Sequence, residues 1–311
     1  MPKTASTRVH EDEKFSLPLF FLTLVLSLAA FIGALRLLAP AGVWQAQVHA
    51  AAWAGAAAFL GLTLANCFVE YFFHRYVLHK PAIPLLSRFY KQHTKHHNLT
   101  RIVRRKTSGG HEVPFVENRF PIVVAAQGEA SFFPWYTLAI FGLLLTPFLI
   151  LLQWALPAFP WFFAGFAALA GSLSLYEVFH AIEHWSLERW SPLLEHRRWG
   201  AFWRKVYSFH LRHHAVIDCN EAISGFFTLP VADLVFGTFI LPKTLYTDGE
   251  EWASKQFKSP KPYWPIRMCD RVAEAMVRRH RAKARRQGAE MEPEAIPAWP
   301  IVPSVEGAPL A

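Results

Sequence analysis

The 311-residue sequence contains little cysteine and little charge. Its three cysteines, Cys67, Cys219 and Cys269, are odd in number and widely separated, which excludes a small disulfide scaffold. We expect them to be reduced thiols in a protein that faces the cytoplasm. Charged residues make up only 18% of the chain and apolar residues 53%, so the sequence is neither intrinsically disordered nor typical of a soluble domain.

Long apolar runs account for this composition. We predict four transmembrane helices, at residues 15–35, 50–73, 134–156 and 161–179. At ~1.5 Å rise per residue, runs of this length match a hydrocarbon core of roughly 30 Å. The first run lacks a small-residue cleavage site, which favours a retained helix over a removed signal peptide. Pro147 predicts a kink in the third run, and short outer turns are expected at residues 36–49 and 157–160.

The distribution of basic residues predicts the orientation. Residues 80–130 contain nine Lys or Arg against three acidic residues, whereas the turn at 157–160 has none. The positive-inside rule therefore places residues 80–130 and 180–311 in the cytoplasm, together with the N-terminal residues 1–14. The net charge of +9 is then explained by orientation and by anionic lipid headgroups, so nucleic acid is not needed as a partner. We expect a multi-pass protein of a bacterial inner membrane.

Residues 241–311 are predicted to form a basic cytoplasmic tail. Eight Lys or Arg between Arg267 and Arg286 indicate an amphipathic helix at the membrane interface. The proline-rich end, residues 293–311, is predicted to be disordered.

Ten of the 15 histidines fall into four groups just after the second and fourth apolar runs. They are His74 and His79; His93, His96 and His97; His180 and His184; and His210, His213 and His214. Positions i, i+3 and i+4 share one face of a helix, so each HxxHH triplet presents three imidazoles together. The five-residue step from His74 to His79 fits an α-helix poorly. It requires a helix end at this point, or ligands to two different metals.

So many imidazoles packed at a membrane surface indicate metal binding, because unpaired polar groups are costly to bury. Ten ligands exceed the four of a structural zinc site, so at least two ions are implied. Imidazole alone does not select the metal. A nitrogen-rich dinuclear site at the base of apolar helices suits the oxidation of an unactivated C–H bond of a lipid chain. This reaction requires dioxygen and a redox metal, so we expect two iron ions with O2 as co-substrate. The remaining histidines, His10, His49, His111, His196 and His280, are interpreted as ordinary surface or interface residues.

The histidine segments resemble a known family. They are HRYVLH (residues 74–79), QHTKHH (92–97), HAIEH (180–184) and FHLRHH (209–214), followed by PVADLVFGT (230–238). In this order they are similar to the membrane fatty acid hydroxylase superfamily, which includes sterol desaturases, ceramide fatty acid hydroxylases and carotenoid hydroxylases. The resemblance covers residues 65–240. It implies that the ten clustered histidines bind two irons at the cytoplasmic face.

The expected fold is all-α, with four spans and a cytoplasmic helical cap in a hydroxylase-like domain at residues 15–240. Family members that act on sphingolipid chains usually have glycine where this chain has Lys95, and they often carry a fused haem domain with a His-Pro-Gly-Gly motif. That motif does not occur in this sequence. Electrons are therefore expected from a separate ferredoxin or reductase.

The expected activity is O2-dependent hydroxylation of a fatty-acyl, sphingoid or related lipid C–H bond. Desaturation or head-group hydroxylation at the same site remains an alternative. HAIEH also fits the HxxEH pattern of zinc peptidases, but this interpretation uses only two of the ten histidines. A metal transporter or sensor would need ionisable residues inside the spans, where Glu70 is the main example. Four positive charges between Arg101 and Lys106 predict that oxidation occurs close to the lipid head group.

We expect no catalytic residue beyond the metal ligands. A metal-bound imidazole usually donates its other N–H to a carboxylate or a carbonyl. Glu183 and Asp233 are the preferred carboxylates, and Asn220 is either a partner of a bound water or a turn residue. The other acidic candidates near the histidines are Glu70, Glu177, Asp218 and Glu221.

Overall fold

The computed structural model describes residues 16–98, 101–106, 110, 112–117, 131–241 and 259–286. The predictions for residues 1–14 and for the proline-rich end, residues 293–311, lie outside the described residues, as do His10 and His111.

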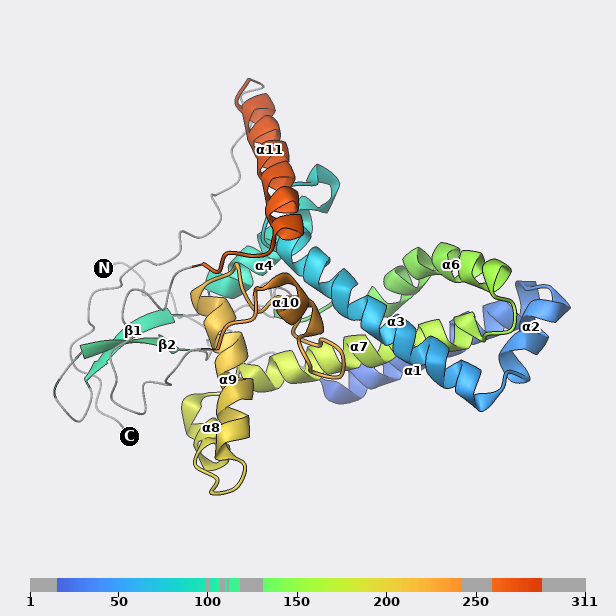
Figure 1. Cartoon of the computed structure of the whole chain (residues 1–311), viewed down its shortest axis with the longest axis horizontal. Helices are drawn as coiled ribbons and strands as arrows, with labels where there is room; N and C mark the ends of the chain where they lie inside the picture. The colour runs from blue at the N-terminus through green and yellow to red at the C-terminus, as the bar shows by residue number, and fades with distance from the viewer. Residues whose placement is uncertain are drawn as a thin grey trace, which may run out of the picture.

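Four described helices are long and apolar enough to cross a membrane, as predicted. They are α1 (Leu17–Leu38), α3 (Ala52–Phe73), α6 (Thr137–Ala155, with Pro147 inside it) and α7 (Trp161–Glu183). They form one elongated bundle (Figure 1). In α7, 44% of the apolar window is buried, against 11–22% in the other three, so α7 is the central helix.

Small residues allow α7 to occupy the centre. Ala164, Gly165 and Ala168 of α7 are buried against the neighbouring helices. A Cβ atom added at Gly165 would lie 2.6 Å from a methyl carbon of Leu149, which is fully buried in α6. Close approach at small residues is how helices gain packing energy in lipid, where the hydrophobic effect between helices is absent.

The connection predicted as a turn at residues 36–49 contains a short helix, α2 (Ala41–Val48), with Gln47 buried. Gln47 Nε2 donates to Gln153 Oε1 at 2.8 Å. Its Oε1 accepts hydrogen bonds from the backbone N–H groups of Phe162 at 3.0 Å and Phe163 at 3.2 Å. Gln47 thus pairs backbone donors at the start of α7 that have no partner within the helix, and it joins α2, α6 and α7 at this end of the bundle.

Gln47→Leu is expected to lower the free energy of unfolding by about 1–3 kcal/mol, because one buried and one partly buried N–H group lose their acceptor. The measurement is thermal unfolding in detergent. Gln45→Leu on the same helix is the control, since Gln45 is exposed and should tolerate the change. Equal melting temperatures for the two variants would contradict this role of Gln47.

The other end of the bundle, where α3 and α7 finish, is called the histidine end. Figure 1 shows the remaining helices gathered there. They are the π-helical turn η1 (His74–Leu78), the 3-10 turn η2 (Pro84–Leu86), α4 (Ser87–Asn98), α8 (Leu187–Leu194), α9 (Gly200–Ala215), α10 (Val231–Phe236) and α11 (Trp264–Arg286).

The described chain is helical, as predicted, apart from one antiparallel hairpin of β1 (Arg101–Lys106) and β2 (Glu112–Glu117). Arg101 pairs with Glu117 and Lys106 with Glu112. Ile102, Val103 and several apolar residues of β2 favour strands, which the prediction of an all-α fold did not include. The side chains of this segment lie outside the described part, so the predicted effect of its charges stays a prediction.

Helix α11 lies in the part of the tail where a helix was expected. Its first turns pack against the protein, because Ile266 is fully buried and Ala273 is 5% exposed. Asp270 on the same helix accepts hydrogen bonds from Arg75 of η1, which directly follows α3. The first turns of the helix are therefore docked on the rest of the protein.

Candidate metal centre

The structure brings the ten clustered histidines together, all of them buried, in two sets of five. Within each set the candidate ligand atoms lie within 4.8 Å of one another. We call them set 1 (His74, His79, His93, His97 and His213) and set 2 (His96, His180, His184, His210 and His214). Neither set includes His49, His196 or His280.

The two sets are built on the same plan. Each takes two histidines from the end of a long helix, either α3 with η1 or α7. Each takes two more at i, i+4 from a later helix, α4 in set 1 and α9 in set 2. The fifth histidine comes from the other half of the chain: His213 of α9 joins set 1, and His96 of α4 joins set 2. The adjacent histidines His96 and His97 therefore belong to different sets, as do His213 and His214. This exchange couples the two halves through one centre.

The π-helical turn explains the five-residue step between His74 and His79. The backbone N–H of His79 donates to the carbonyl of His74 at 3.1 Å, an i to i+5 bond. The two rings lie stacked with centroids 4.8 Å apart. A helix end, and not a division between two metals, accommodates the spacing. Single π-helical turns often occur at functional sites.

The imidazole nitrogens are spaced as ligands of one ion would be. In set 1, His93 Nε2 lies 3.0 Å from the Nε2 atoms of His74 and His97. In set 2, His210 Nε2 lies 2.8 Å from His184 Nε2 and 3.0 Å from His214 Nε2. Two nitrogens bound at ~2.1 Å to one ion are about 3.0 Å apart at a right angle and about 3.4 Å apart in a tetrahedron. Each set therefore has the dimensions of one coordination shell.

Two backbone carbonyls fix ring tautomers in set 1. His74 Nδ1 donates to the carbonyl of Glu221 at 2.6 Å, and His213 Nδ1 donates to the carbonyl of Cys219 at 2.8 Å. Since a carbonyl only accepts, each neutral ring carries its proton on Nδ1 and presents an Nε2 lone pair to the set. Converging lone pairs in a buried space require a cation. The residues therefore fit a metal ion, and nitrogen donors suit iron, zinc, copper and nickel.

Burial keeps these rings in the neutral form that binds metal. Burial lowers the pKa of His213 to about 4, although its bond to the Cys219 carbonyl acts in the opposite direction. Burial, and next the neighbouring imidazoles, hold the pKa of six further rings well below the usual value. These are His79, His93, His96, His97, His210 and His214. The sets are thus ready for metal without loss of a proton.

Asp233, one of the two preferred carboxylates, acts on the site through the backbone. Its Oδ1 accepts from the N–H of Glu221 at 2.9 Å and the hydroxyl of Thr238 at 2.7 Å, and its Oδ2 accepts from the N–H of Ala222 at 2.9 Å. It thereby holds the loop whose Glu221 carbonyl accepts the hydrogen bond from His74 Nδ1. Glu183, the other preferred carboxylate, places Oε2 3.7 Å from His210 Nδ1, which is beyond hydrogen-bond distance.

Asn220 is a turn residue. Its backbone has φ 56°, and its side chain bonds to the backbone of Phe209 and Ile240 at 2.8–2.9 Å. Asp218 accepts from the hydroxyl of Ser259 at 2.9 Å. Neither side chain bonds to a histidine ring in the part of the chain that the structure describes.

The two other candidate glutamates in the spans bond to backbone groups. Glu177 accepts from the N–H of Phe133 at 2.9 Å. Glu70 accepts from the N–H groups of Ser224 and Gly225 at 2.8 and 3.1 Å. Glu70 therefore has a structural partner, and a role in a transport path is not needed to explain it.

The sequence did not reveal an ion-pair network beside set 1. Arg75, which follows His74, is 3% exposed and donates to the Glu221 carboxylate at 3.1 Å and to Asp270 at 3.0 and 2.9 Å. Lys80 also reaches Asp270, at 3.2 Å. Burial acts to raise the pKa of Asp270, but the bonds and charges of Arg75 and Lys80 outweigh it and hold that pKa below its usual range. The only sequence signal was an arginine next to a candidate ligand.

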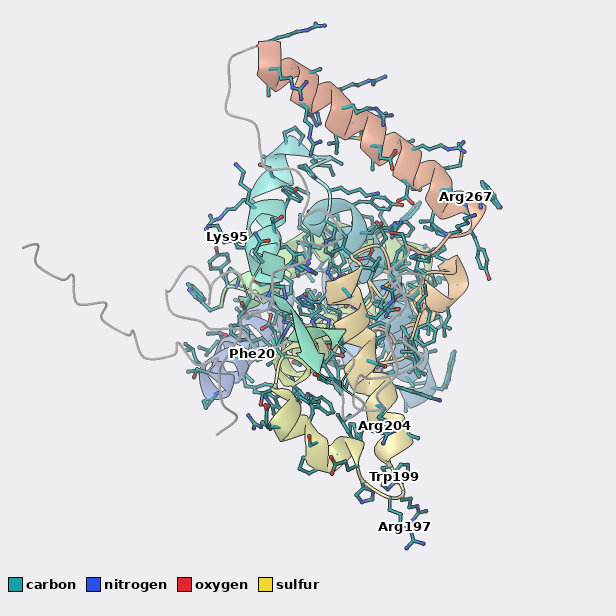
Figure 2. The ribbon with its side chains drawn as sticks, turned by 90° about the vertical axis from the view of Figure 1, so that its left-hand side faces the viewer. Phe20, Lys95, Arg197, Trp199, Arg204 and Arg267 are labelled. Atoms are coloured by element: carbon teal, nitrogen blue, oxygen red, sulfur yellow. The ribbon has the colours of Figure 1, made fainter. Side chains whose placement is uncertain are left out.

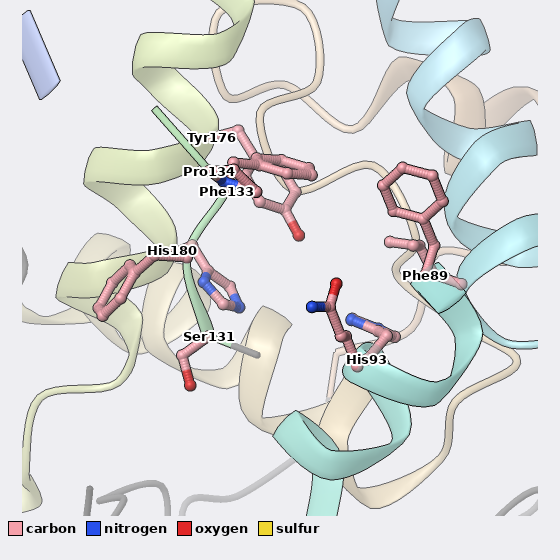
Figure 3. A pocket seen from close by; sticks show the side chains of 10 residues that line it. Phe89, His93, Ser131, Phe133, Pro134, Tyr176 and His180 are labelled. Atoms are coloured by element: carbon pink, nitrogen blue, oxygen red, sulfur yellow. The ribbon is translucent and has the colours of Figure 1, made fainter. Parts of the chain in front are cut away.

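A recess reaches both sets of histidines. Figure 3 shows His93 of set 1 and His180 of set 2 at its lining, with the Tyr176 hydroxyl pointing into it. Its other walls are mostly apolar, with Gln92 and Ser131 as further polar residues. The apolar residues are Leu78, Phe89, Phe132, Phe133 and Pro134. A hydrocarbon chain in this recess would lie beside both sets.

Figure 2 shows the histidine end face-on, with basic side chains at its edge. Lys95, Arg197 and Arg267 are labelled there. Lys95, where the sequence departs from sphingolipid-specific members of the family, is exposed. Lys95 therefore lies on the protein surface, although the two residues that follow it, His96 and His97, are buried in the histidine sets.

No family model, no curated protein and no solved structure matches the chain. The buried histidine sets and the apolar helices are compatible with a histidine-box membrane enzyme. The resemblance to membrane fatty acid hydroxylases thus depends on the histidine pattern itself.

Proposed function

We propose that the chain is a membrane-embedded di-iron enzyme that uses O2 to hydroxylate a lipid. The observation that carries this proposal is the pair of five-histidine sets with a shared, mostly apolar recess. Five imidazoles leave one position of a six-coordinate ion for a ligand from outside the protein. Such a centre suits redox chemistry on a small molecule better than a purely structural role.

When bound, two ferrous ions would supply the site at which dioxygen is reduced, with one oxygen atom entering a C–H bond and the other leaving as water. Two electrons and two protons complete the balance. The electrons must come from a separate ferredoxin or reductase. The exposed basic side chains at the edge of the histidine end suit an acidic protein partner of this kind (Figure 2).

The chain's own residues hold the substrate and exclude water. Phe89, Phe133 and Pro134 provide an apolar wall for a hydrocarbon segment. Tyr176 stacks on His180 with ring centroids 5.4 Å apart, and its hydroxyl points into the recess (Figure 3). Tyr176, Gln92 and Ser131 can bond a polar group of the lipid close to the histidines.

The arrangement gives less support to a zinc peptidase built on HAIEH. A peptidase needs the glutamate in front of the metal, where it activates water. Glu183 instead lies on the Nδ1 side of the His210 ring, whose Nε2 faces set 2. The five-histidine set also exceeds the three protein ligands of a catalytic zinc.

The proposal is tested by comparing lipids from aerobic cells that express the chain with lipids from cells that express a His213→Ala variant. Hydroxylation adds 16 mass units and desaturation removes two, and growth under 18O2 identifies the source of the new oxygen. A +16 product labelled by 18O2 supports the hydroxylase. A product lacking two hydrogens supports the alternative desaturase, and unchanged lipids with a fully iron-loaded protein would refute both.

We expect the new hydroxyl group close to the polar end of the lipid, on the first acyl carbons, on a long-chain base or on the head group. Polar residues of the recess adjoin His93 and His180, so a bonded head group would leave its nearest carbons beside both sets. Fragmentation of the product by tandem mass spectrometry locates the hydroxyl. A hydroxyl at mid-chain or at the methyl end would show that the recess admits the lipid tail first.

A further inference from the structure

After α9 the chain returns to the side of α3. The returning segment, residues 223–236, contains a hairpin-like turn at Phe226–Leu229 and then α10. Glu70 of α3 accepts from the hydroxyl of Ser224 at 2.5 Å, in addition to the two backbone bonds described above. Glu70 lies inside the candidate span Ala52–Leu78. These bonds fix the start of the returning segment against α3, one helical turn before His74.

The segment then runs further along α3, away from the histidine end. The ring of Phe227 lies 6.1 Å from the ring of Phe59, centroid to centroid. Phe59 is eleven residues before Glu70, a distance of about 16 Å along a helix. The tip of the segment thus lies beside the middle of a helix that is long enough to cross the membrane, although the sequence placed residues 180–311 in the cytoplasm.

Backbone groups at the tip of the segment form hydrogen bonds with one another. The N–H of Phe226 donates to the carbonyl of Leu229 at 2.8 Å, and the N–H of Leu229 donates back at 3.1 Å. Gly225 has φ 51°, and an added Cβ atom would lie 2.4 Å from the Leu229 carbonyl oxygen, so this turn needs glycine. Backbone within hydrocarbon must find its hydrogen-bond partners in the protein, and this turn meets much of that need.

The outer surface of the segment is apolar. Leu229 is 58% exposed, Leu234 is 54% exposed and Val235 is 50% exposed. From residue 222 to residue 238 the only charged side chain is Asp233, which is fully buried. On the adjacent helix, Leu60 and Val69 are also exposed, which is the pattern of a lipid-facing surface. Such a patch in water would be unfavourable.

Two exposed aromatic residues lie beside the end of this apolar segment, at the start of α11. Tyr263 is 58% exposed and Trp264 is 70% exposed, and Tyr263 N–H donates to the carbonyl of Phe236 at 2.9 Å. Exposed Tyr and Trp favour the boundary between lipid and water. Helix α11, which begins there, runs across the bundle axis in Figure 1 and not along it. This is the direction of a helix at the membrane surface.

We propose that residues 223–236 form a re-entrant element that inserts into the bilayer beside α3, with the acyl chains of membrane lipids against Leu229, Leu234 and Val235. Tyr263 and Trp264 then lie at the lipid head groups, at the start of α11. The proposal concerns how the chain sits in its membrane and does not depend on the metal or on the reaction.

The test is nitroxide labelling of full-length protein in lipid nanodiscs. Of the three cysteines, Cys67 and Cys219 are buried and Cys269 is exposed, so a Cys269→Ser background leaves no exposed thiol. Single cysteines are introduced by Leu229→Cys, by Leu60→Cys as a lipid-facing reference on α3, and by Glu274→Cys as an exposed reference on α11. Collision rates with dissolved O2 and with a water-soluble nickel chelate are then compared, since O2 concentrates in lipid.

We expect the ratio of O2 to nickel collisions at Leu229→Cys to be severalfold higher than at Glu274→Cys and close to that at Leu60→Cys. Val235→Cys provides a second position if the first variant does not fold. Nickel access at both positions equal to that at Glu274→Cys would overturn the proposal and place the segment in water.

Discussion

Protein purified from iron-replete cells is expected to contain about two metal ions per chain, and His96→Ala and His213→Ala should each reduce this to about one and abolish lipid oxidation. Each of these histidines is the ligand that its set takes from the other half of the chain. Its removal leaves four ligands and breaks the connection between the halves. The measurements are metal analysis after size-exclusion chromatography and mass spectrometry of lipids from the expressing cells.

Two histidines outside the sets are the controls. His280 lies on α11, and His196 lies in an exposed turn where its Nδ1 accepts from the backbone N–H groups of Arg198 and Trp199. His196→Ala and His280→Ala should keep both ions and the activity. No more than one ion in the parent protein would contradict a dinuclear centre, and an active His213→Ala variant would remove that residue from it.

The histidine pattern predicted which ten residues come together, but not which of them belong to set 1 and which to set 2. Helical spacing shows that His93, His96 and His97 share a face, yet neighbouring residues on a helix point about 100° apart. That angle is enough to direct His96 and His97 to different sets. The assignment depends on how the histidines of α4 and α9 meet in the folded chain, which no local spacing specifies.

The partners of the rings were harder to predict than the rings themselves. The sequence favoured carboxylates, whereas His74 and His213 donate to the backbone carbonyls of Glu221 and Cys219. Any residue can offer a carbonyl, so side-chain identity carries no signal for it. The acidic residues near the site instead shape the loop or pair with Arg75.

The spans were predictable because length and apolarity are local properties, but the path of residues 223–236 was not. This segment is too short to cross a membrane, and its position beside α3 depends on bonds between Glu70 and residues 154–155 positions later. The positive-inside rule assigns whole connecting segments to one side and does not resolve a short return within one of them.

Asp233→Ala is expected to release the ion of set 1 while leaving that of set 2, and to lower the free energy of unfolding by about 3 kcal/mol or more. Three donors, the N–H groups of Glu221 and Ala222 and the hydroxyl of Thr238, would lose a buried carboxylate acceptor. Hydrogen bonds to a charged group contribute about 1.5–3 kcal/mol each. The loop would then no longer hold the Glu221 carbonyl at His74 Nδ1.

Metal content distinguishes this positioning role from general destabilisation, because general destabilisation would not select one set. Folded Asp233→Ala protein should hold about one ion, and combining it with His96→Ala should leave about none, whereas combining it with His213→Ala should leave about one. Asp218→Ala is the matched control, since its carboxylate bonds to Ser259 and not to the loop N–H groups. Two results would show that the loop does not orient His74: retention of both ions by Asp233→Ala, or equal loss of metal from both sets. In either case the double variants with His96→Ala and with His213→Ala would have the same metal content.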